Sequence, residues 1–429
     1  MPSRLSIVFM KDAPSVVFAD DSGKVFDFEP LAMVARSADY LIPVEDKDVI
    51  PMPEGSCLYV LKDRHPIGID RETGEIVVVD ENPFRKGSPA FAVAVFLPAA
   101  YTQTYLAAWA KTDRATILPF FSYTACGWKQ GFVTTAIRTD ESRRQDPDTF
   151  DMEKVRSGIE RWKSIFPRNR LVQHLVHCAL VYGCPAALNM FQAREEAPLP
   201  TSPSCNARCV GCISHQPEGF PPSPQERISI VPSPEEIAEV ALYHIENVEM
   251  PVVSFGQGCE GEPLLAGDII ERAIQKIRKK TDKGTINLNS NASLPDVVAR
   301  LADAGLDSLR ISMNSARERS YNAYFRPGYD FNALLLSSLE MKKRDRFVSI
   351  NLFVFPGVTD APKEVDGLKR FLSHARVDMI QWRNLNIDPD LYLDTLGQKF
   401  PPGLGVARLI EGMPIKRGYF NPYLSKLDE

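Results

Sequence analysis

The sequence lacks any long apolar run. A membrane-spanning helix needs about 20 consecutive apolar residues, whereas the longest candidate, AFAVAVFLPAAY at positions 90–101, is shorter and is interrupted by Pro98. The first residues, MPSRLSIVFMKDAPS, carry charged side chains early and contain no apolar core of the length that a secretory signal needs. We therefore expect a cytoplasmic protein with no membrane partner.

The sequence also lacks a strong excess of charge of either sign. Its 50 basic and 55 acidic residues leave a net charge of −5, which predicts no broad nucleic-acid surface, although a local basic groove stays open. Hydrophobic residues make up 44% and charged residues 24% of the chain, as is usual for globular proteins that bury large cores. The length of 429 residues predicts two or three domains.

Cysteine is scarce, with eight residues in the chain and none after Cys259. In a reducing compartment such thiols serve as metal ligands, reactive groups or small buried side chains rather than as disulfides. Cys178 and Cys184 have no third or fourth ligand evident beside them, so we expect two buried cysteines and keep a second metal site as the weaker alternative. Cys57 and Cys126 are predicted to be structural. For Cys259, a thiol that faces the substrate and a small buried side chain are equally open.

Residues 1–141 are predicted to form a β-rich accessory domain. Short β-branched and aromatic runs, among them PSVVFAD, KVFDF, CLYVL and FAVAVFL, stand between turn residues, and the stretch AAYTQTYLAAWAK at 99–111 is predicted to interrupt them with a helix. A polar stretch that contains proline follows. Apolar residues then recur at three- and four-residue steps in MEKVRSGIERWKSIF and RLVQHLVHCALVYG, so we expect a helical connecting segment over 142–196.

Residues 197–390 alternate between short apolar runs and amphipathic segments. Such alternation favours parallel β/α units, of which we count about six strands. Ser233 and Glu236 form a capping box that begins one helix, and Gly305 ends another. The predicted fold class is α/β, a partial (β/α)6 TIM-like barrel, with residues 391–429 as a tail or cover. In parallel barrels the chemistry lies at the carboxyl ends of the strands.

The stretch SPSCNARCVGCISHQ at 202–216 follows the first predicted strand of this barrel. It places Cys205, Cys209 and Cys212 in a C-x3-C-x2-C spacing. A structural zinc site closes with four ligands, and His215 would supply the fourth. A cluster of four irons also takes four donors, so three thiolates would leave one iron open to a substrate or cofactor. On these residues alone, both kinds of metal site stay open.

The cysteine spacing, on a loop after the first strand of a β/α barrel, resembles that of the radical S-adenosylmethionine (SAM) superfamily. The resemblance implies that Cys205, Cys209 and Cys212 bind three irons of one 4Fe–4S cluster and that SAM chelates the open iron. It further implies that an electron from the cluster cleaves SAM to methionine and a 5′-deoxyadenosyl radical, which abstracts hydrogen from a substrate. A protein such as flavodoxin or ferredoxin would be the electron-donating partner.

Further stretches match the superfamily in the expected order. SFGQGCEGEPLL resembles its second-strand turn, where a carboxylate and backbone groups receive the SAM ammonium as a charge-assisted pair. LNSNAS, LRISMNS and FVFPGVTD resemble the ends of its next three strands. The cofactor-binding residues that the resemblance implies are Gly261, Glu262, Pro263, Asn289, Ser290, Asn291, Arg310, Ser312, Asn314, Val354, Pro356 and Gly357.

One position departs from the superfamily pattern. The residue before the third cysteine, usually an aromatic that packs on adenine, is Gly211. The cysteines that hold auxiliary clusters in many peptide-modifying members have no counterpart after Cys259.

The resemblance does not name the substrate, so a peptide, an RNA base and a small molecule all stay open. The alternative from another class is a non-catalytic interaction protein that binds zinc through Cys205, Cys209, Cys212 and His215.

Overall fold

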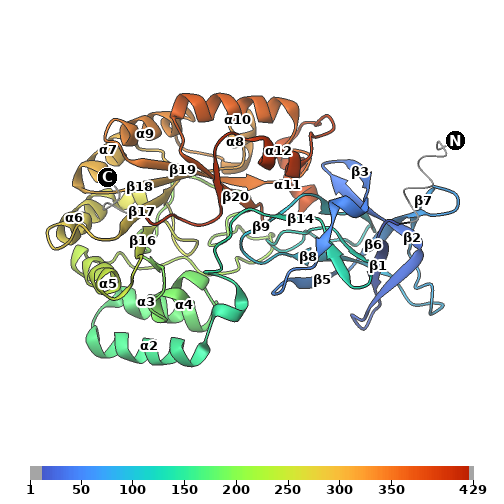
Figure 1. Ribbon diagram of the computed structural model, residues 1–429, viewed down its shortest axis with the longest axis horizontal. Coiled ribbons are helices and arrows are strands. Elements are labelled where there is room, and N and C mark those ends of the chain that lie inside the picture. The colour runs from blue at the N-terminus through green and yellow to red at the C-terminus, as the bar shows by residue number, and fades with distance from the viewer. Residues whose placement is uncertain (1–11, 425–429) are drawn as a thin grey trace. The chain divides into compact units, whose positions relative to one another are not determined.

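The computed structural model describes residues 12–424 (Figure 1). The chain divides into two compact units. The first contains the chain up to Thr139 together with Val354–Asp366 and Arg383–Pro414. The second contains Asp140–Phe353, Gly367–Trp382 and the chain from Ile415 onward. Both units are thus built from segments that lie far apart in the sequence.

Short antiparallel strands dominate the first unit, which confirms the predicted β-rich N-terminal region. Twelve strands form one sheet. Seven of them follow the path β11-β6-β2-β1-β12-β13-β4, and the other five, β3, β5, β7, β8 and β10, pair with strands beside this path. Strands β9 and β14 form a second, two-stranded sheet. The strands are β1 (Ser15–Ala19), β2 (Val25–Ser37), β3 (Tyr40–Pro43), β4 (Ile50–Pro51), β5 (Cys57–Leu61), β6 (Arg64–Asp70), β7 (Ile76–Val78), β8 (Phe91–Phe96), β9 (Tyr101–Gln103), β10 (Leu106–Ala107), β11 (Trp109–Lys111), β12 (Cys126–Trp128), β13 (Phe132–Thr134) and β14 (Ala136–Arg138).

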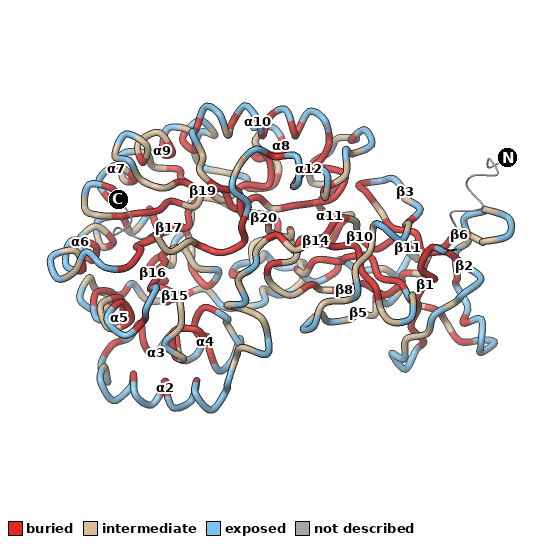
Figure 2. The backbone as a smooth tube through the Cα atoms, viewed as in Figure 1, coloured by how far each residue is buried: buried red, intermediate tan, exposed pale blue. Residues whose placement is uncertain are grey.

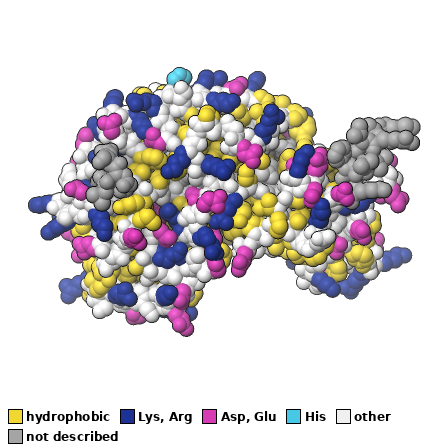
Figure 3. All heavy atoms as spheres, in the orientation of Figure 1, with side chains coloured by type: hydrophobic (Ala, Val, Ile, Leu, Met, Phe, Trp, Pro, Cys, Tyr) yellow, Lys and Arg dark blue, Asp and Glu magenta, His cyan; other side chains and the backbone are white. Residues whose placement is uncertain are grey.

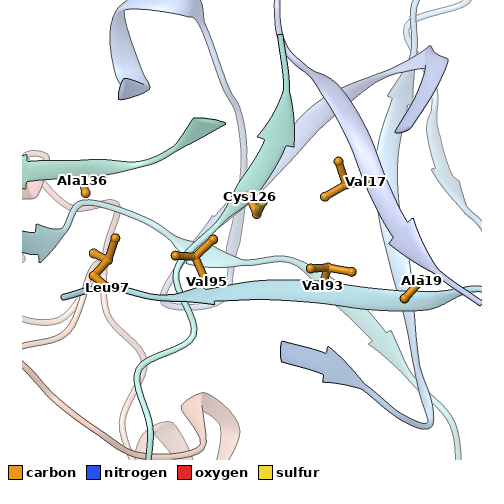
Figure 4. Close-up of a cluster of buried hydrophobic side chains, with 7 residues drawn as sticks. All are labelled: Val17, Ala19, Val93, Val95, Leu97, Cys126 and Ala136. Carbon is orange, nitrogen blue, oxygen red and sulfur yellow. The ribbon is translucent and has the colours of Figure 1, made fainter. Parts of the chain in front are cut away.

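Alternate side chains of these strands meet in apolar clusters. The cluster drawn in Figure 4 consists of Val17, Ala19, Val93, Val95, Leu97, Cys126 and Ala136. Cys126 is therefore a core side chain, and burial raises the pKa of its thiol to about 12. Cys57 is exposed at the start of β5.

The helix predicted over 99–111 is wrong, because the structure has β9, β10 and β11 there. Periodicity in so short an apolar run does not separate a helix from strands. The three segments pair with β14, β2 and β6 respectively, so distant strands supply the backbone hydrogen bonds that a helix would have supplied locally. Threonine and tyrosine at 102, 104 and 105 also favour extended backbone.

Two further helices, α11 (Pro389–Leu396) and α12 (Val406–Gly412), belong to the first unit. Asp388 caps the first turn of α11. Its second oxygen accepts a hydrogen bond from the Leu118 amide at 2.8 Å and lies 3.4 Å from the Arg64 guanidinium. Both charged side chains are almost fully buried, so one carboxylate joins this part of the chain to the β-rich strands.

Three helices begin the second unit. They are α2 (Met152–Ile165), α3 (Arg170–Leu180) and α4 (Pro185–Phe191). At Gly158 the backbones of α2 and α4 come so close that a Cβ atom would lie 1.8 Å from the Phe191 carbonyl oxygen. Glycine is required for that approach.

A curled parallel sheet follows these helices (Figure 1). Seven strands are ordered β15 (Glu196–Pro198), β16 (Val252–Phe255), β17 (Thr285–Ser290), β18 (Ser308–Met313), β19 (Phe347–Val354), β20 (Met379–Asn384) and β21 (Lys416–Gly418). The associated helices are α5 (Pro234–Asn247), α6 (Gly267–Arg278), α7 (Pro295–Ala304), α8 (Glu318–Phe325), α9 (Asn332–Lys342) and α10 (Pro362–Ala375). Figure 2 shows the strands buried and the outer helix faces exposed.

The predicted partial barrel is confirmed, with one addition. The first six parallel strands match the six that the sequence predicts, and the short polar strand β21 pairs with β20 as a seventh. The predicted capping box is present, because Ser233 accepts from the Glu236 amide while the Glu236 carboxylate accepts from the Ser233 amide. Gly305 ends α7 at φ 115°, in the left-handed region that glycine favours.

The exterior carries charges of both signs. On the face in Figure 3, Lys and Arg side chains are interspersed with Asp and Glu side chains. In the described part of the chain no single helix is long and apolar enough to cross a membrane. Helices α3 and α4 reach the required length and apolar content only when counted together, and they are bent by 116° relative to each other.

Candidate functional site

Four neighbouring parallel strands lead into the segments that the sequence analysis singled out. The cysteine loop (residues 199–216) follows β15, the GEP turn (residues 261–263) lies after β16, Asn291 follows β17 and Asn314 follows β18. Carboxyl ends of neighbouring parallel strands meet at one edge of a sheet, which is where parallel β/α folds place their chemistry.

Backbone hydrogen bonds hold the cysteine loop against the end of α8. The amides of Arg208 and Val210 donate to the carbonyl oxygens of Phe325 and Tyr324, each at 3.0 Å. The three cysteines of the loop, Cys205, Cys209 and Cys212, are half-buried and carry free thiols. The loop is therefore fixed through its backbone, which leaves its thiols available as ligands.

Asn206 connects the cysteine loop to the end of β17. Its side-chain oxygen accepts from Asn291 Nδ2 at 2.7 Å, and its Nδ2 donates to Ser293 Oγ at 2.9 Å. Its carbonyl oxygen accepts from the Gly328 amide at 2.8 Å. Asn291, which the resemblance marks as a cofactor contact, thus also positions the loop that carries the cysteines.

The GEP turn is bonded directly to the start of the cysteine loop. The amide of Gly261 donates to the Ser202 carbonyl oxygen and the amide of Glu262 to the Ser204 carbonyl oxygen, both at 2.7 Å. A Cβ atom on Gly261 would lie 2.0 Å from the Ser204 oxygen. Glycine is therefore needed here because two backbones touch.

The Glu262 carboxylate is buried among hydrogen-bond donors. It accepts from Ser290 Oγ at 2.5 Å, from the Asn291 amide at 2.8 Å and from the Leu264 amide at 3.1 Å. Burial still raises the pKa of Glu262 to about 7, against the lowering effect of these donors. A nearby cation would favour the ionised form and offset this rise.

A second buried carboxylate, Glu260, was missed by the sequence analysis. One oxygen accepts from the amides of Thr201 and Ser202 at 2.8 and 2.9 Å, and the other accepts from the amides of Gly256 and Gln257, both at 2.7 Å. Burial raises the pKa of Glu260 to about 7. Its sequence neighbours Cys259 and Gly261 give no signal of this role, which depends on contacts with the cysteine loop.

Two thiols of the cysteine loop, those of Cys205 and Cys209, lie in surroundings that disfavour free thiolates. Burial raises the pKa of Cys205, and burial followed by the charges of Cys212 and Cys205 raises that of Cys209 well above its ordinary value. Cys212 Sγ lies 3.5 Å from an Arg227 Nη2 donor. Three thiolates placed together here would need a bound cation to offset their mutual repulsion.

A single zinc ion at the cysteine loop would need its thiols close together. Two thiolates on one tetrahedral zinc lie about 3.8 Å apart, given a Zn–S distance of about 2.3 Å. Among the described residues, the group of three ligand atoms found within 4.8 Å of one another belongs to His174, Cys178 and Cys259, not to the cysteine loop. His215, the fourth ligand in the zinc hypothesis, is exposed.

Other predicted residues belong to a buried polar network. Arg310 Nη1 donates to Gln381 Oε1 at 2.9 Å, and Gln381 Nε2 donates to Asn421 Oδ1 at 3.2 Å. Asn421 in turn donates to Glu196 and Ser254. Arg310 therefore has a structural partner on β20, and the chain after β21 supplies one member of the network.

The remaining predicted residues lie in several local settings. Asn289 donates to the Gly256 carbonyl oxygen at 3.1 Å, and Asn314 donates to the Ser320 carbonyl oxygen at 3.1 Å. Ser312 is half-buried on β18. Val354 ends β19. Gly357 has φ 86° and lies close to Ala38, which belongs to the same unit. A Cβ atom on Gly357 would lie 2.2 Å from the Ala38 amide nitrogen. Pro356 accepts from that Ala38 amide at 2.9 Å.

Two tyrosines near the site were also missed. The hydroxyl groups of Tyr321 and Tyr329 lie 2.7 Å apart. Burial raises the pKa of both phenols, and the charges of Cys209 and Glu262 raise them further. Both tyrosines therefore stay neutral and can donate hydrogen bonds beside the cysteine loop. Nothing in their sequence spacing signals this role, because Tyr321 on α8 and Tyr329 after α8 reach the cysteine loop only through the fold.

The sequence pattern that describes the radical SAM superfamily matches residues 199–368. Residues 199–368 form a radical SAM domain. The matched span covers the cysteine loop, the GEP turn and the ends of the next three strands.

Curated relatives of the radical SAM domain include GTP 3′,8-cyclases. The one from Lactiplantibacillus plantarum is 29% identical over 157 residues, which is 36% of this chain and 44% of that protein. The one from Clostridium botulinum is 30% identical over 162 residues, which is 36% of this chain and 46% of that protein. The chain thus spans about half the length of the curated relatives it matches.

The solved structures that this chain matches share little sequence with it, and each match covers only part of both chains. The structure of anSMEcpe with bound AdoMet is 20% identical with a TM-score of 0.33, over 44% of this chain and 51% of that one. The FeFe-hydrogenase maturase HydG from Carboxydothermus hydrogenoformans is 15% identical with a TM-score of 0.36, over 60% of this chain and 67% of that one.

The radical SAM family uses a 4Fe–4S cluster and SAM, and the residues of this site fit both groups. Three free thiols on one backbone-anchored loop supply three soft donors, as an iron–sulfur cluster requires. A buried carboxylate three residues after Cys259, at Glu262, supplies a negative charge near these thiols, as a ligand ammonium requires.

Substitution of Gly261 tests whether the GEP turn positions the cysteine loop. In Gly261→Ala the new Cβ must displace the Ser204 backbone, a type of overpacking that costs about 1–3 kcal/mol. We expect the iron content after anaerobic reconstitution to fall well below that of the unaltered chain. Gly412→Ala, where a Cβ meets nothing within 4 Å, is the matched control. Equal iron content in both variants would show that the turn does not hold the loop.

Proposed function

We propose that the protein is a radical SAM enzyme that cleaves SAM reductively and abstracts a hydrogen atom from its substrate. The observation that carries the proposal is the direct bonding of the cysteine loop to the GEP turn, through the Gly261 and Glu262 amides. Those bonds bring the C-x3-C-x2-C thiols and a buried carboxylate to one strand edge of a radical SAM domain.

Cys205, Cys209 and Cys212 would hold three irons of one 4Fe–4S cluster, which leaves one iron for SAM. When bound, such a cluster supplies the electron that converts SAM to methionine and a 5′-deoxyadenosyl radical. The chain itself orients the thiolates through the Asn206 and α8 contacts. Arg227, beside Cys212, would offset part of the negative charge of the loaded site.

Glu262 would receive the ammonium group of SAM. Its three hydrogen-bond donors fix the carboxylate in place, so little side-chain entropy would be lost when the cation binds. Gly261 and Pro263 would shape the turn that presents it. The other cofactor contacts that we propose are Asn289, Ser290, Asn291, Arg310, Ser312, Asn314, Val354, Pro356 and Gly357.

The substrate stays open among a peptide, an RNA base and a small molecule. Because the curated relatives are GTP 3′,8-cyclases, GTP is the first small molecule to test. A reduced flavodoxin or ferredoxin would serve as the electron donor. The contacts that select a substrate in such enzymes come from loops and accessory parts rather than from the cofactor motifs.

Anaerobic reconstitution with iron and sulfide, followed by dithionite and SAM, tests the proposed chemistry. We expect about four irons per chain and 5′-deoxyadenosine, detected by chromatography. Cys209→Ala should abolish both, because one thiolate ligand is lost, whereas Cys57→Ala, at an exposed thiol of the β-rich strands, should change neither. A colourless protein that binds one zinc and leaves SAM intact would refute the proposal and support the zinc-binding interaction protein.

The proposed role of Glu262 predicts a pH dependence of SAM binding. Its pKa is raised to about 7, so the carboxyl gains a proton, and loses its attraction for an ammonium, as pH falls through that value. Without reductant, we expect the Kd of SAM to rise by up to about tenfold per pH unit below this point.

Glu262→Gln should weaken SAM binding at neutral pH and flatten this dependence, because the amide is neutral throughout. Glu246→Gln, at an exposed position of α5, is the matched control and should retain both the affinity and the slope. A Glu262→Gln variant that keeps the unaltered slope would assign the pH dependence to another group.

A further inference from the structure

Three ligand atoms outside the cysteine loop lie in one tight group. They belong to His174 and Cys178 on α3 and to Cys259 in the loop after β16, and all lie within 4.8 Å of one another. His174 Nε2 lies 3.4 Å from Cys178 Sγ. Two ligands of one tetrahedral zinc ion lie about 3.6 Å apart when one is an imidazole nitrogen and the other a thiolate, so this pair already has the required spacing.

Helix α3 explains how two of the donors come together. His174 and Cys178 are four residues apart, so they project from the same face one turn after the other. Cys178 is 2% exposed and Cys259 is 4% exposed, whereas His174 is half-buried. Two buried thiols and one partly accessible imidazole leave the group shielded from solvent yet reachable by an ion on the histidine side.

The third donor comes from a loop with a fixed backbone. The carbonyl oxygen of Cys259 accepts from the Ile228 amide at 2.7 Å, and the Glu260 amide donates to the Gln257 carbonyl oxygen at 3.2 Å. The Glu260 side chain accepts from the Gly256 and Gln257 amides at the start of this loop and from the Thr201 and Ser202 amides of the cysteine loop. Cys259 is thus presented to α3 by a preorganised turn, as a metal ligand requires.

We propose that His174, Cys178 and Cys259 bind one zinc ion. Two thiolates and one imidazole are the donor types that zinc selects in proteins, and a small donor such as water would complete the tetrahedron. Cys184 lies close by, because its amide donates to the Cys178 carbonyl oxygen at 3.0 Å. No third ligand near Cys178 is evident in the sequence, because Cys259 is 81 residues away in the chain. Only the fold brings Cys259 close to Cys178.

The zinc ion would join α3 to the loop that continues into the GEP turn. Cys259 stands two residues before Gly261, so a metal that fixes Cys259 restrains the turn that contacts the cysteine loop. The role assigned to zinc is structural, and it does not depend on whether the cysteine loop binds a cluster.

Metal analysis of variants of the full chain tests this site separately from the proposed iron site. In a chain with Cys205, Cys209 and Cys212 all changed to Ser, we expect about one zinc per chain by mass spectrometry. Adding Cys178→Ser or His174→Ala to this background should remove the zinc, and adding Cys57→Ser should not. In the chain with its cysteine loop intact, His174→Ala should lose zinc and keep iron.

Cobalt substitution supplies a second readout. With Co²⁺ as the probe, we expect the cysteine-loop triple variant to show thiolate-to-metal charge-transfer bands and the strong visible bands of a tetrahedral ion. Adding His174→Ala should remove these bands. His174 is half-buried, so its substitution carries less folding risk than that of either buried cysteine. Zinc should also raise the Tm of the triple variant, because an ion that binds only the folded state stabilises it. Zinc content that His174→Ala and Cys178→Ser leave unchanged, or iron and sulfide bound in place of zinc, would overturn the proposal.

Discussion

Two buried carboxylates, Glu260 and Glu262, join the ends of three parallel strands. Glu260 accepts four backbone amides, two after β15 and two after β16. Glu262 accepts from Ser290 and Asn291 at the end of β17. Without these acceptors the buried backbone amides of Thr201, Ser202 and Asn291 would lack partners, at a cost of about 1–3 kcal/mol each. The cysteine loop, the GEP turn and the loop that carries Cys259 are all held by this arrangement.

The same arrangement has an electrostatic consequence. Desolvation raises the pKa of both carboxyls to about 7 although every oxygen accepts hydrogen bonds. A site that holds two such acids is only partly ionised near neutral pH, so a bound cation would shift it toward the charged form. Glu260 is already saturated by backbone donors, which leaves Glu262 as the carboxylate better suited to an incoming ammonium.

Local signals in the sequence predicted most of the parallel sheet. The capping box at Ser233, the stop at Gly305 and the alternation of strand and helix patterns depend on residues near one another, and the structure reproduces them. The helix predicted over 99–111 failed because its hydrogen-bond partners are strands far away in the chain. The pairing of β21 with β20 could not be predicted from three polar residues.

The candidate site was predicted as a set of motifs, not as a set of contacts. Spacing marked the three cysteines as metal ligands, and the resemblance to the radical SAM superfamily marked Glu262. Glu260, Tyr321 and the His174–Cys178–Cys259 group were missed because each acquires its surroundings only through tertiary packing. Arg310 was expected as a cofactor contact, and its hydrogen bond to Gln381 on β20 could not be predicted because the two residues are 71 positions apart in the chain.

The measurement that tests the central claim most directly is Mössbauer spectroscopy of the protein reconstituted with 57Fe, before and after addition of SAM. The account predicts a 4Fe–4S cluster in which roughly one quarter of the iron signal, that of the iron without a cysteine ligand, shifts when SAM binds, while the other three irons keep their parameters. A spectrum that SAM leaves unchanged, or iron that is not in a 4Fe–4S cluster, would contradict the assignment of Cys205, Cys209 and Cys212 as a three-thiolate ligand set with one open iron.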